Sequence, residues 1–161
     1  VLCDTPGMMV GPEIERTGLV RHCSRLFVTG PNVTVPLVTM IIRKAYGLGA
    51  QAMAGGDMKK PMFSVAWPTG EYGGMGLEGQ MKLGFRNELA AIDDPETRKK
   101  RYDELVAAAY ERGRALNGGV SFAFDDVIDP ADSRRWISRT FGSVPPPMKR
   151  DGKKRPNVDT W

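Results

Sequence analysis

The chain has 161 residues, of which 41% are hydrophobic and 26% are charged, which is the size and composition of a single globular domain. No apolar run reaches the ~18 residues of a membrane-spanning helix, and a net charge of +4 is too small to indicate nucleic-acid binding. Cys3 and Cys23 form no C-x-x-C pair, and the chain holds nine methionines. This usage is typical of a reducing compartment, so we expect a cytoplasmic protein with no membrane or nucleic-acid partner.

The N-terminal part of the chain predicts strands that alternate with helices. Residues 1–3 form an apolar strand with no segment before it, so we expect a fragment that begins inside a domain. Residues 13–28 predict a helix with one apolar stripe that includes the only histidine, His22. A packed histidine is expected on that stripe. The continuous apolar run at 35–42 then predicts a strand that is buried on both faces, as in a parallel sheet.

The rest of the chain is expected to be mainly helical. Helices are predicted at 50–53, 77–83, 95–116 and 130–141, with one more strand at 62–67 and glycine-rich turns over 70–79. Asp129 is the expected N-cap of the last helix. A proline triplet at 145–147 leads into a basic tail. The sequence therefore predicts an α/β domain over 1–144 with a helical C-terminal part, followed by a proline-rich basic tail over 145–161.

The turn after the buried strand carries the strongest functional indication. Backbone N–H groups at a helix N-terminus have no intrahelical acceptor, and they can stabilise a developing anion. A strand that leads through Gly47-Leu48-Gly49 into an alanine-rich helix places such groups together. The pattern predicts a main-chain anion site that needs no catalytic side chain.

Other motifs lack the context that their functions need. Asp4-Thr5-Pro6-Gly7 resembles a GTPase turn, but 43–46 lacks both the Asn and the Asp of the guanine-reading N-K-x-D motif. The G-x-G-x-x-G at 74–79 follows no buried strand, so it does not match a dinucleotide fingerprint. One histidine and two distant cysteines do not fit a zinc site, and the aspartates at 125–132 lack calcium-loop spacing. No metal site is expected.

Short motifs occur in a definite order: D-T-P-G (4–7), R-H (21–22), T-V-P-L-V-T (34–39), R-K-A-Y-G (43–47), A-W-P-T-G-E (66–71), M-G-x-E-G (75–79) and D-D-V-I-D-P-A-D-S-R (125–134). Over about residues 1–141 they resemble the carboxyltransferase component of biotin-dependent acyl-CoA carboxylases, the family of propionyl-CoA and acetyl-CoA carboxylase β subunits. The resemblance implies a crotonase-like (ClpP/crotonase) fold. It also implies that this chain is the later part of the C-terminal domain, truncated at its N-terminal side.

The resemblance implies a reaction and a set of site residues. These enzymes transfer a carboxyl group from carboxybiotin to the α-carbon of an acyl-CoA, and the biotin is carried by a partner domain. By alignment, the N–H groups of Leu48 and Gly49, after Gly47, would hold the biotin ureido oxygen. The expected lining of the biotin and acyl pocket is Tyr46, Ala50, Gln51, Gly74, Met75 and Gly76. Implied partners are a biotin carboxylase, a biotin carrier and further copies of the chain, which share active sites between subunits.

Two departures from the family pattern affect the choice of substrate. Leu48 stands where members commonly have glycine, and Gln51 stands where propionyl-type members carry aspartate. The sequence therefore leaves the acyl group open. It also leaves open a biotin-dependent decarboxylase coupled to a sodium pump, a crotonase-type hydratase or isomerase, and a non-catalytic assembly module. The isolated segment is expected to be inactive, because the enolate-binding half of the site belongs to another domain.

Overall fold

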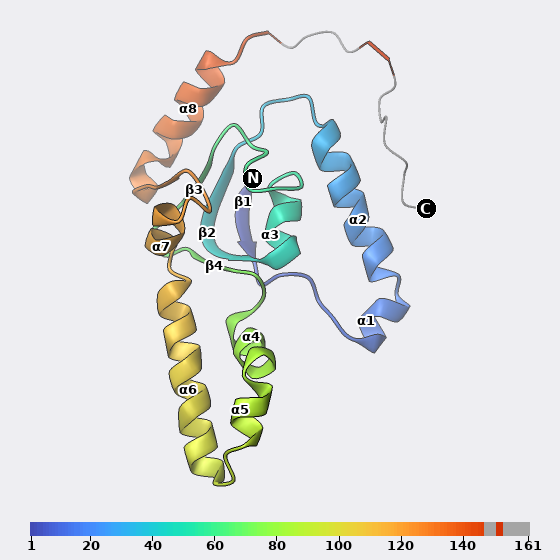
Figure 1. Cartoon of the computed structure of the whole chain (residues 1–161). Helices are drawn as coiled ribbons and strands as arrows, with labels where there is room; N and C mark the ends of the chain where they lie inside the picture. The colour runs from blue at the N-terminus through green and yellow to red at the C-terminus, as the bar shows by residue number, and fades with distance from the viewer. Residues whose placement is uncertain (147–150, 153–161) are drawn as a thin grey trace.

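A computed structural model of the chain describes residues 1–146 and 151–152, and its centre is a parallel β-sheet (Figure 1). Its path across the described residues is β1 (Leu2–Thr5), β2 (Thr39–Tyr46), β3 (Ser64–Ala66) and β5 (Asp126–Val127). A further strand, β4 (Glu71–Gly73), pairs with β2. All of these pairs are parallel, which confirms the predicted α/β class.

Strand β2 is central and determines where the other elements lie. Its first half pairs with β3, its second half pairs with β4, and β1 lies along its other side. β2 covers 39–46 rather than the predicted 35–42. The shift arises because Arg43 and Lys44 are accommodated inside the strand, where Asp4 of β1 bonds to both. The strand therefore continues to Tyr46 and ends directly at the turn.

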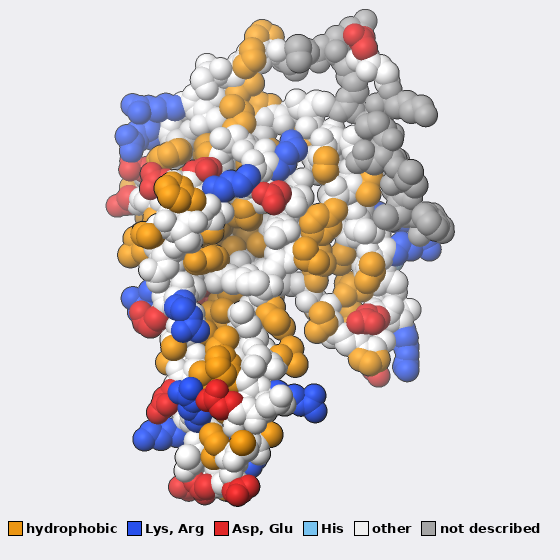
Figure 2. Space-filling view, in the orientation of Figure 1, with side chains coloured by type: hydrophobic (Ala, Val, Ile, Leu, Met, Phe, Trp, Pro, Cys, Tyr) orange, Lys and Arg blue, Asp and Glu red, His pale blue; other side chains and the backbone are white. Residues whose placement is uncertain are grey.

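The predicted helix over 13–28 is two helices, α1 (Pro12–Arg16) and α2 (Leu19–Thr29), followed by a 3₁₀ turn over Gly30–Asn32. Gly18 between them has a φ of 75°, which a continuous helix does not allow. Neither helix has a buried residue, so the expectation that His22 is packed was wrong: it is exposed. Figure 2 shows hydrophobic side chains gathered over this side of the molecule.

Three helices form a hairpin that extends from the sheet (Figure 1). They are α4 (Leu77–Gly84), α5 (Arg86–Ala90) and α6 (Pro95–Arg112). The Asp94 side chain caps α6 by accepting the N–H of Thr97 at 2.8 Å. The predicted helix over 95–116 stops at Gly113, whose carbonyl accepts the N–H of Tyr72 at 2.8 Å. A separate helix, α7 (Ala115–Val120), then begins.

The C-terminal part returns to the sheet. After β5, a 3₁₀ turn over Pro130–Asp132 is capped by Asp129, which accepts the N–H of Ala131 at 2.8 Å, and α8 (Ser133–Ser143) follows. Most of the tail predicted over 145–161 lies outside the described residues, so that boundary stays a prediction. No helix within the described residues combines the length and apolar composition that a bilayer crossing requires.

Neighbouring residues at the end of β2 face different hydrophobic clusters. Ala45 packs in a cluster that contains Cys3, Ile41 and Phe124. Tyr46 belongs to the cluster between the sheet and the hairpin, in contact with residues of α4 and α6. This division follows from the alternation of side chains along a strand. The side chains of β2 near the turn are therefore distributed to opposite faces of the sheet.

Candidate functional site

The connection from β2 to α3 (Gly47–Met53) contains no loop residue, because the helix begins immediately after Tyr46. Gly47 has a φ of 55°, and a Cβ at this position would lie 2.7 Å from the carbonyl oxygen of Gly74. Both conditions require glycine. Leu48 keeps a negative φ, since Phe122 is the only non-glycine residue with positive φ in the described part of the chain. The turn therefore accepts leucine at 48 without backbone strain.

The first turn of α3 presents free backbone donors. The N–H groups of Leu48 and Gly49 precede the first possible intrahelical acceptor, and no other group among the described residues accepts from them. Gly49 is buried against the D-T-P-G turn: a Cβ on Gly49 would lie 3.0 Å from the Cα of Gly7. This close contact holds the donor-bearing turn against the end of β1.

A cleft of about 380 Å³ lies beside this turn, within the usual range for small-molecule sites. Its walls come from α3, β2, β4 and two loops that are distant in sequence. They are formed by Ile41, Ala45, Gly47, Leu48, Ala50, Gln51, Asp57, Met58, Lys59, Tyr72, Gly73, Gly74, Ala123 and Phe124. Most of these walls are apolar, and the 58% exposed side chain of Leu48 is one of them.

The structure brings together most of the residues that the sequence singled out. Gly47, Leu48, Ala50, Gln51 and Gly74 all line the cleft. The remaining expected residues, Tyr46, Gly49, Met75 and Gly76, are not among its walls. The Tyr46 side chain is only 3% exposed and packs on the hairpin side of the sheet.

Sequence reasoning missed the walls contributed by 57–59, by Tyr72 and by 123–124. Phe124 directly precedes the D-D-V-I-D motif, which is the one feature that could have drawn attention to it. The 57–59 segment carries no motif or periodicity. Its place in the cleft depends on contacts with residues later in the chain: the Ser64 hydroxyl donates to the Met58 carbonyl, and Lys59 Nζ lies 3.3 Å from Asp125 Oδ1.

The charged groups at the cleft rim are held by specific contacts. Lys59 Nζ lies 3.3 Å from Asp125 Oδ1, and Asp125 Oδ2 accepts the N–H of Ser64 at 2.7 Å. The Asp57 carboxylate accepts the backbone N–H of Lys59 at 2.7 Å. No cluster of three or more potential metal-binding side chains occurs in the described residues. The N–H groups at the start of α3 are therefore main-chain donors beside the cleft, and the Gln51 side-chain amide also lines it.

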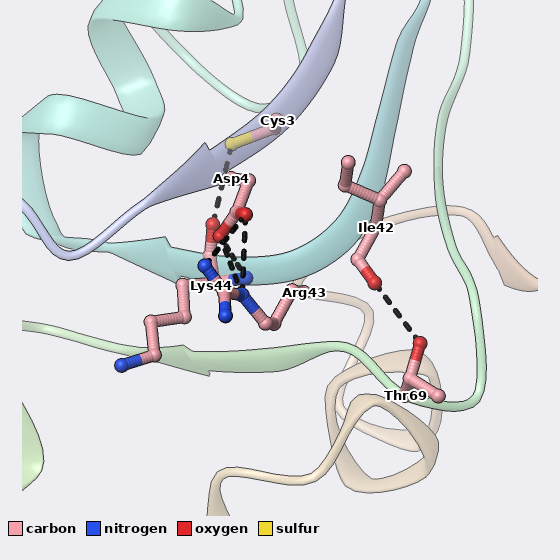
Figure 3. Close-up of polar contacts among 6 residues, drawn as sticks. All are labelled: Cys3, Asp4, Ile42, Arg43, Lys44 and Thr69. Atoms are coloured by element: carbon pink, nitrogen blue, oxygen red, sulfur yellow. Dashed lines mark hydrogen bonds and ion pairs between the residues drawn. The ribbon is translucent and has the colours of Figure 1, made fainter.

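Asp4 of the D-T-P-G motif connects β1 to the end of β2 (Figure 3). Its two carboxylate oxygens accept bonds from Arg43 Nε at 3.2 and 3.1 Å, and Oδ1 also accepts the N–H of Lys44 at 3.2 Å. The hydrogen bond from Arg43 lowers the pKa of Asp4. Beside it, burial raises the pKa of the Cys3 thiol to about 11. The motif therefore anchors the strand pair that carries the turn.

This contact predicts an acid-dependent loss of stability. Because the pKa of Asp4 is lower in the folded state than its ordinary value of 3.8, its stabilising contribution is complete above pH ~4 and disappears as the pH falls through the folded-state pKa. We expect Asp4→Asn to lower the urea midpoint at neutral pH and to weaken the dependence on pH below 4. Urea titrations of both proteins at several pH values test this. Parallel curves for the two proteins would contradict it.

Comparisons with known proteins agree with these features. Residues 1–143 match the carboxyl transferase domain family. The chain is 38% identical over 135 residues to the carboxyltransferase subunit of propionyl-CoA carboxylase from Haloferax mediterranei, covering 83% of this chain and 25% of that protein. It is 37% identical over 139 residues to the methylmalonyl-CoA carboxyltransferase 12S subunit of Propionibacterium freudenreichii subsp. shermanii, covering 85% and 26%.

Solved structures share the fold. A single-chain, multi-domain long-chain acyl-CoA carboxylase aligns with a TM-score of 0.75 at 56% identity, covering 86% of this chain and 13% of that one. The transcarboxylase 12S structure aligns with a TM-score of 0.75 at 31% identity, covering 96% and 30%. These alignments confirm the crotonase-like carboxyltransferase fold. The chain spans about a quarter of the length of the curated relatives, and it belongs to the carboxyl transferase domain family.

Proposed function

We propose that this chain is part of a carboxyltransferase that moves a carboxyl group from carboxybiotin to the α-carbon of an acyl-CoA. The observation that carries this proposal is the turn at Gly47. It leaves the N–H groups of Leu48 and Gly49 without acceptors in the described chain, and Leu48 lines the adjoining cleft. Membership of the carboxyl transferase domain family supports the same reaction class.

The cleft fits the head group of biotin. Such a ligand needs apolar walls for its ring and hydrogen-bond donors for one carbonyl oxygen. Leu48, Ala50, Met58 and Phe124 provide apolar wall, and the first turn of α3 provides donors. When bound, carboxybiotin supplies the carboxyl group that is transferred.

The residues of this chain contribute orientation and electrostatic stabilisation. The N–H groups of Leu48 and Gly49 are proposed to donate to the ureido oxygen, where negative charge develops. Because these dipoles are fixed by the helix and by the contacts of Gly47 and Gly49, they need no reorganisation during the reaction. The walls of the cleft exclude water and restrict the pose of the reacting groups. No acid or base from this chain is required in this scheme, because the ureido nitrogen that is freed when the N–carboxyl bond breaks would take the α-proton, and the carboxyl group would bond to the α-carbon in its place.

The partners are also proposals. We propose that the full protein acts with a biotin carboxylase and a biotin carrier, that it is cytoplasmic, and that copies of the chain share active sites. The relatives named as carboxyltransferase subunits support a multi-component enzyme, and the transcarboxylase 12S structure is described as a hexamer assembly. The acyl group stays open, since relatives are named for propionyl-CoA, methylmalonyl-CoA and long-chain acyl-CoA.

A second candidate is the decarboxylase direction. The chain is 33% identical over 144 residues to the α subunit of methylmalonyl-CoA decarboxylase from Propionigenium modestum, covering 89% of this chain and 27% of that protein. The same donors would serve that reaction. Membrane subunits that co-purify with the full protein would favour the decarboxylase. A biotin carboxylase that co-purifies with it would favour the carboxylase.

The test uses the full-length protein. We would measure decarboxylation of malonyl-CoA, methylmalonyl-CoA and a long-chain carboxyacyl-CoA with and without added free biotin. Turnover that rises with biotin is the expected result, and the preferred thioester identifies the acyl group. Turnover of these thioesters that is the same with and without added biotin would contradict the proposal. Hydration of an enoyl-CoA without biotin would favour crotonase-type chemistry instead.

A further inference from the structure

Tyr46 is the residue from which the Gly47 turn departs, and its side chain lies on the far side of the sheet from the cleft. It is the last residue of β2 and packs in the cluster that contains Leu77 and Met81 of α4. Its hydroxyl donates to Glu71 Oε2 at 2.8 Å. The side chain thus makes one specific polar contact from a buried position and contributes nothing to the cleft walls.

Glu71 belongs to the strand that shapes the turn. In the β2–β4 pair, Lys44 lies opposite Glu71 and Tyr46 lies opposite Gly73. The next residue, Gly74, supplies the carbonyl that approaches Gly47. The Tyr46–Glu71 bond therefore crosses the same pair of strands that brings Gly74 against the turn.

β4 pairs with β2 over only three residues. The N–H of its middle residue, Tyr72, points away from β2 and donates to Gly113, as alternate N–H groups along a parallel strand do. The register of so short a pair also depends on side-chain contacts across the two strands, and the Tyr46–Glu71 bond is one of them. Burial and the neighbouring Glu71 carboxylate both raise the pKa of Tyr46, so its hydroxyl stays a donor throughout the physiological range.

We propose that Tyr46 is a positioning residue for carboxyl transfer, which fixes the direction of the Leu48 and Gly49 N–H groups through its hydrogen bond to Glu71. This inference rests on the proposed function. Loss of the bond would let β4 and the Gly47–Gly74 contact shift relative to α3. The donors would then be displaced from the oxygen that they stabilise, while the binding of the thioester would be little affected.

The main test is Tyr46→Phe in the full-length protein, assayed by biotin-stimulated decarboxylation of its preferred thioester. Phenylalanine keeps the ring packing and removes only the hydroxyl. We expect kcat to fall about tenfold, since a displacement of ~1 Å at a reacting centre costs up to ~10²-fold, with KM for the thioester unchanged. Glu71→Gln keeps an oxygen acceptor and should retain activity. Glu71→Ala should match Tyr46→Phe, and the double variant should lose no more than either single one.

Tyr110→Phe is the matched control. Tyr110 Oη donates to the Glu78 carboxylate within the same hairpin, so the change removes a bond of the same type away from β2. Its kcat should equal that of the wild type. Wild-type kcat in a folded Tyr46→Phe protein, or an equal loss in both variants, would overturn the inference. A wild-type protein without biotin-stimulated turnover would instead overturn the proposed function, and the inference with it.

Discussion

Replacement of Leu48 by proline is expected to lower biotin-stimulated turnover by about 10²-fold, the usual loss when one oxyanion donor is removed. Leu48 lies in the first turn of α3, where its N–H serves no intrahelical bond. Proline is tolerated at such positions, so the helix should survive while one proposed donor is lost. The measurement is kcat of the full-length protein with saturating thioester and free biotin.

Leu48→Ala is the control for this prediction. It removes a side chain of the cleft wall but keeps the N–H, so turnover should fall far less than in Leu48→Pro. Gly49→Pro removes the other proposed donor but is a less specific change. Gly49 packs against Gly7, and the proline ring would disturb that contact. Full turnover in a folded Leu48→Pro protein would show that this N–H does not stabilise the reaction.

Replacement of Phe124 by alanine is expected to destabilise the domain by about 3–5 kcal/mol, the usual cost of deleting a buried aromatic ring. Phe124 is 1% exposed. Its ring meets that of Tyr72 edge-on, with centroids 5.8 Å apart and an interplanar angle of 87°. The ring also occupies the space that a side chain on Gly118 would need. Urea unfolding of the domain within the full-length protein measures the loss.

Replacement of Phe122, two residues earlier, by glycine should raise the stability of the domain rather than lower it. It is 76% exposed and has a φ of 57° at the end of α7. The N–H groups of Phe122 and Ala123 donate to Gly119 and Gly118 in the pattern of a Schellman cap. Glycine relieves the left-handed strain, so Phe122→Gly should stabilise by about 1 kcal/mol. Equal losses of stability in Phe124→Ala and Phe122→Gly would contradict both predictions, because they would mean that the buried ring contributes no more than the exposed one.

The elements with strong local patterns were predicted well, and the short ones were not. The apolar run before Arg43 identified the central strand, and the helical pattern that starts at Pro95 marked the start of α6. Strands β4 and β5 were missed because they have three and two residues and no alternation of their own. They are strands because β2 and β3 supply hydrogen-bonding edges. Helix ends at Gly18 and Gly113 were missed for a similar reason, since glycine inside an amphipathic pattern does not by itself end a helix.

The sequence by itself determined the parallel α/β class, the family, and the position of the turn at Gly47, because apolar runs, glycines and motif order are local properties of the chain. Only the tertiary structure decided which residues form the cleft and which do not. Met58 and Phe124 reach it through the pairing of distant strands, whereas Tyr46 faces the hairpin. Strand register sets the face on which each side chain lies, and a shift of one residue reverses it. That register depends on contacts between segments far apart in the chain, which a local pattern does not specify.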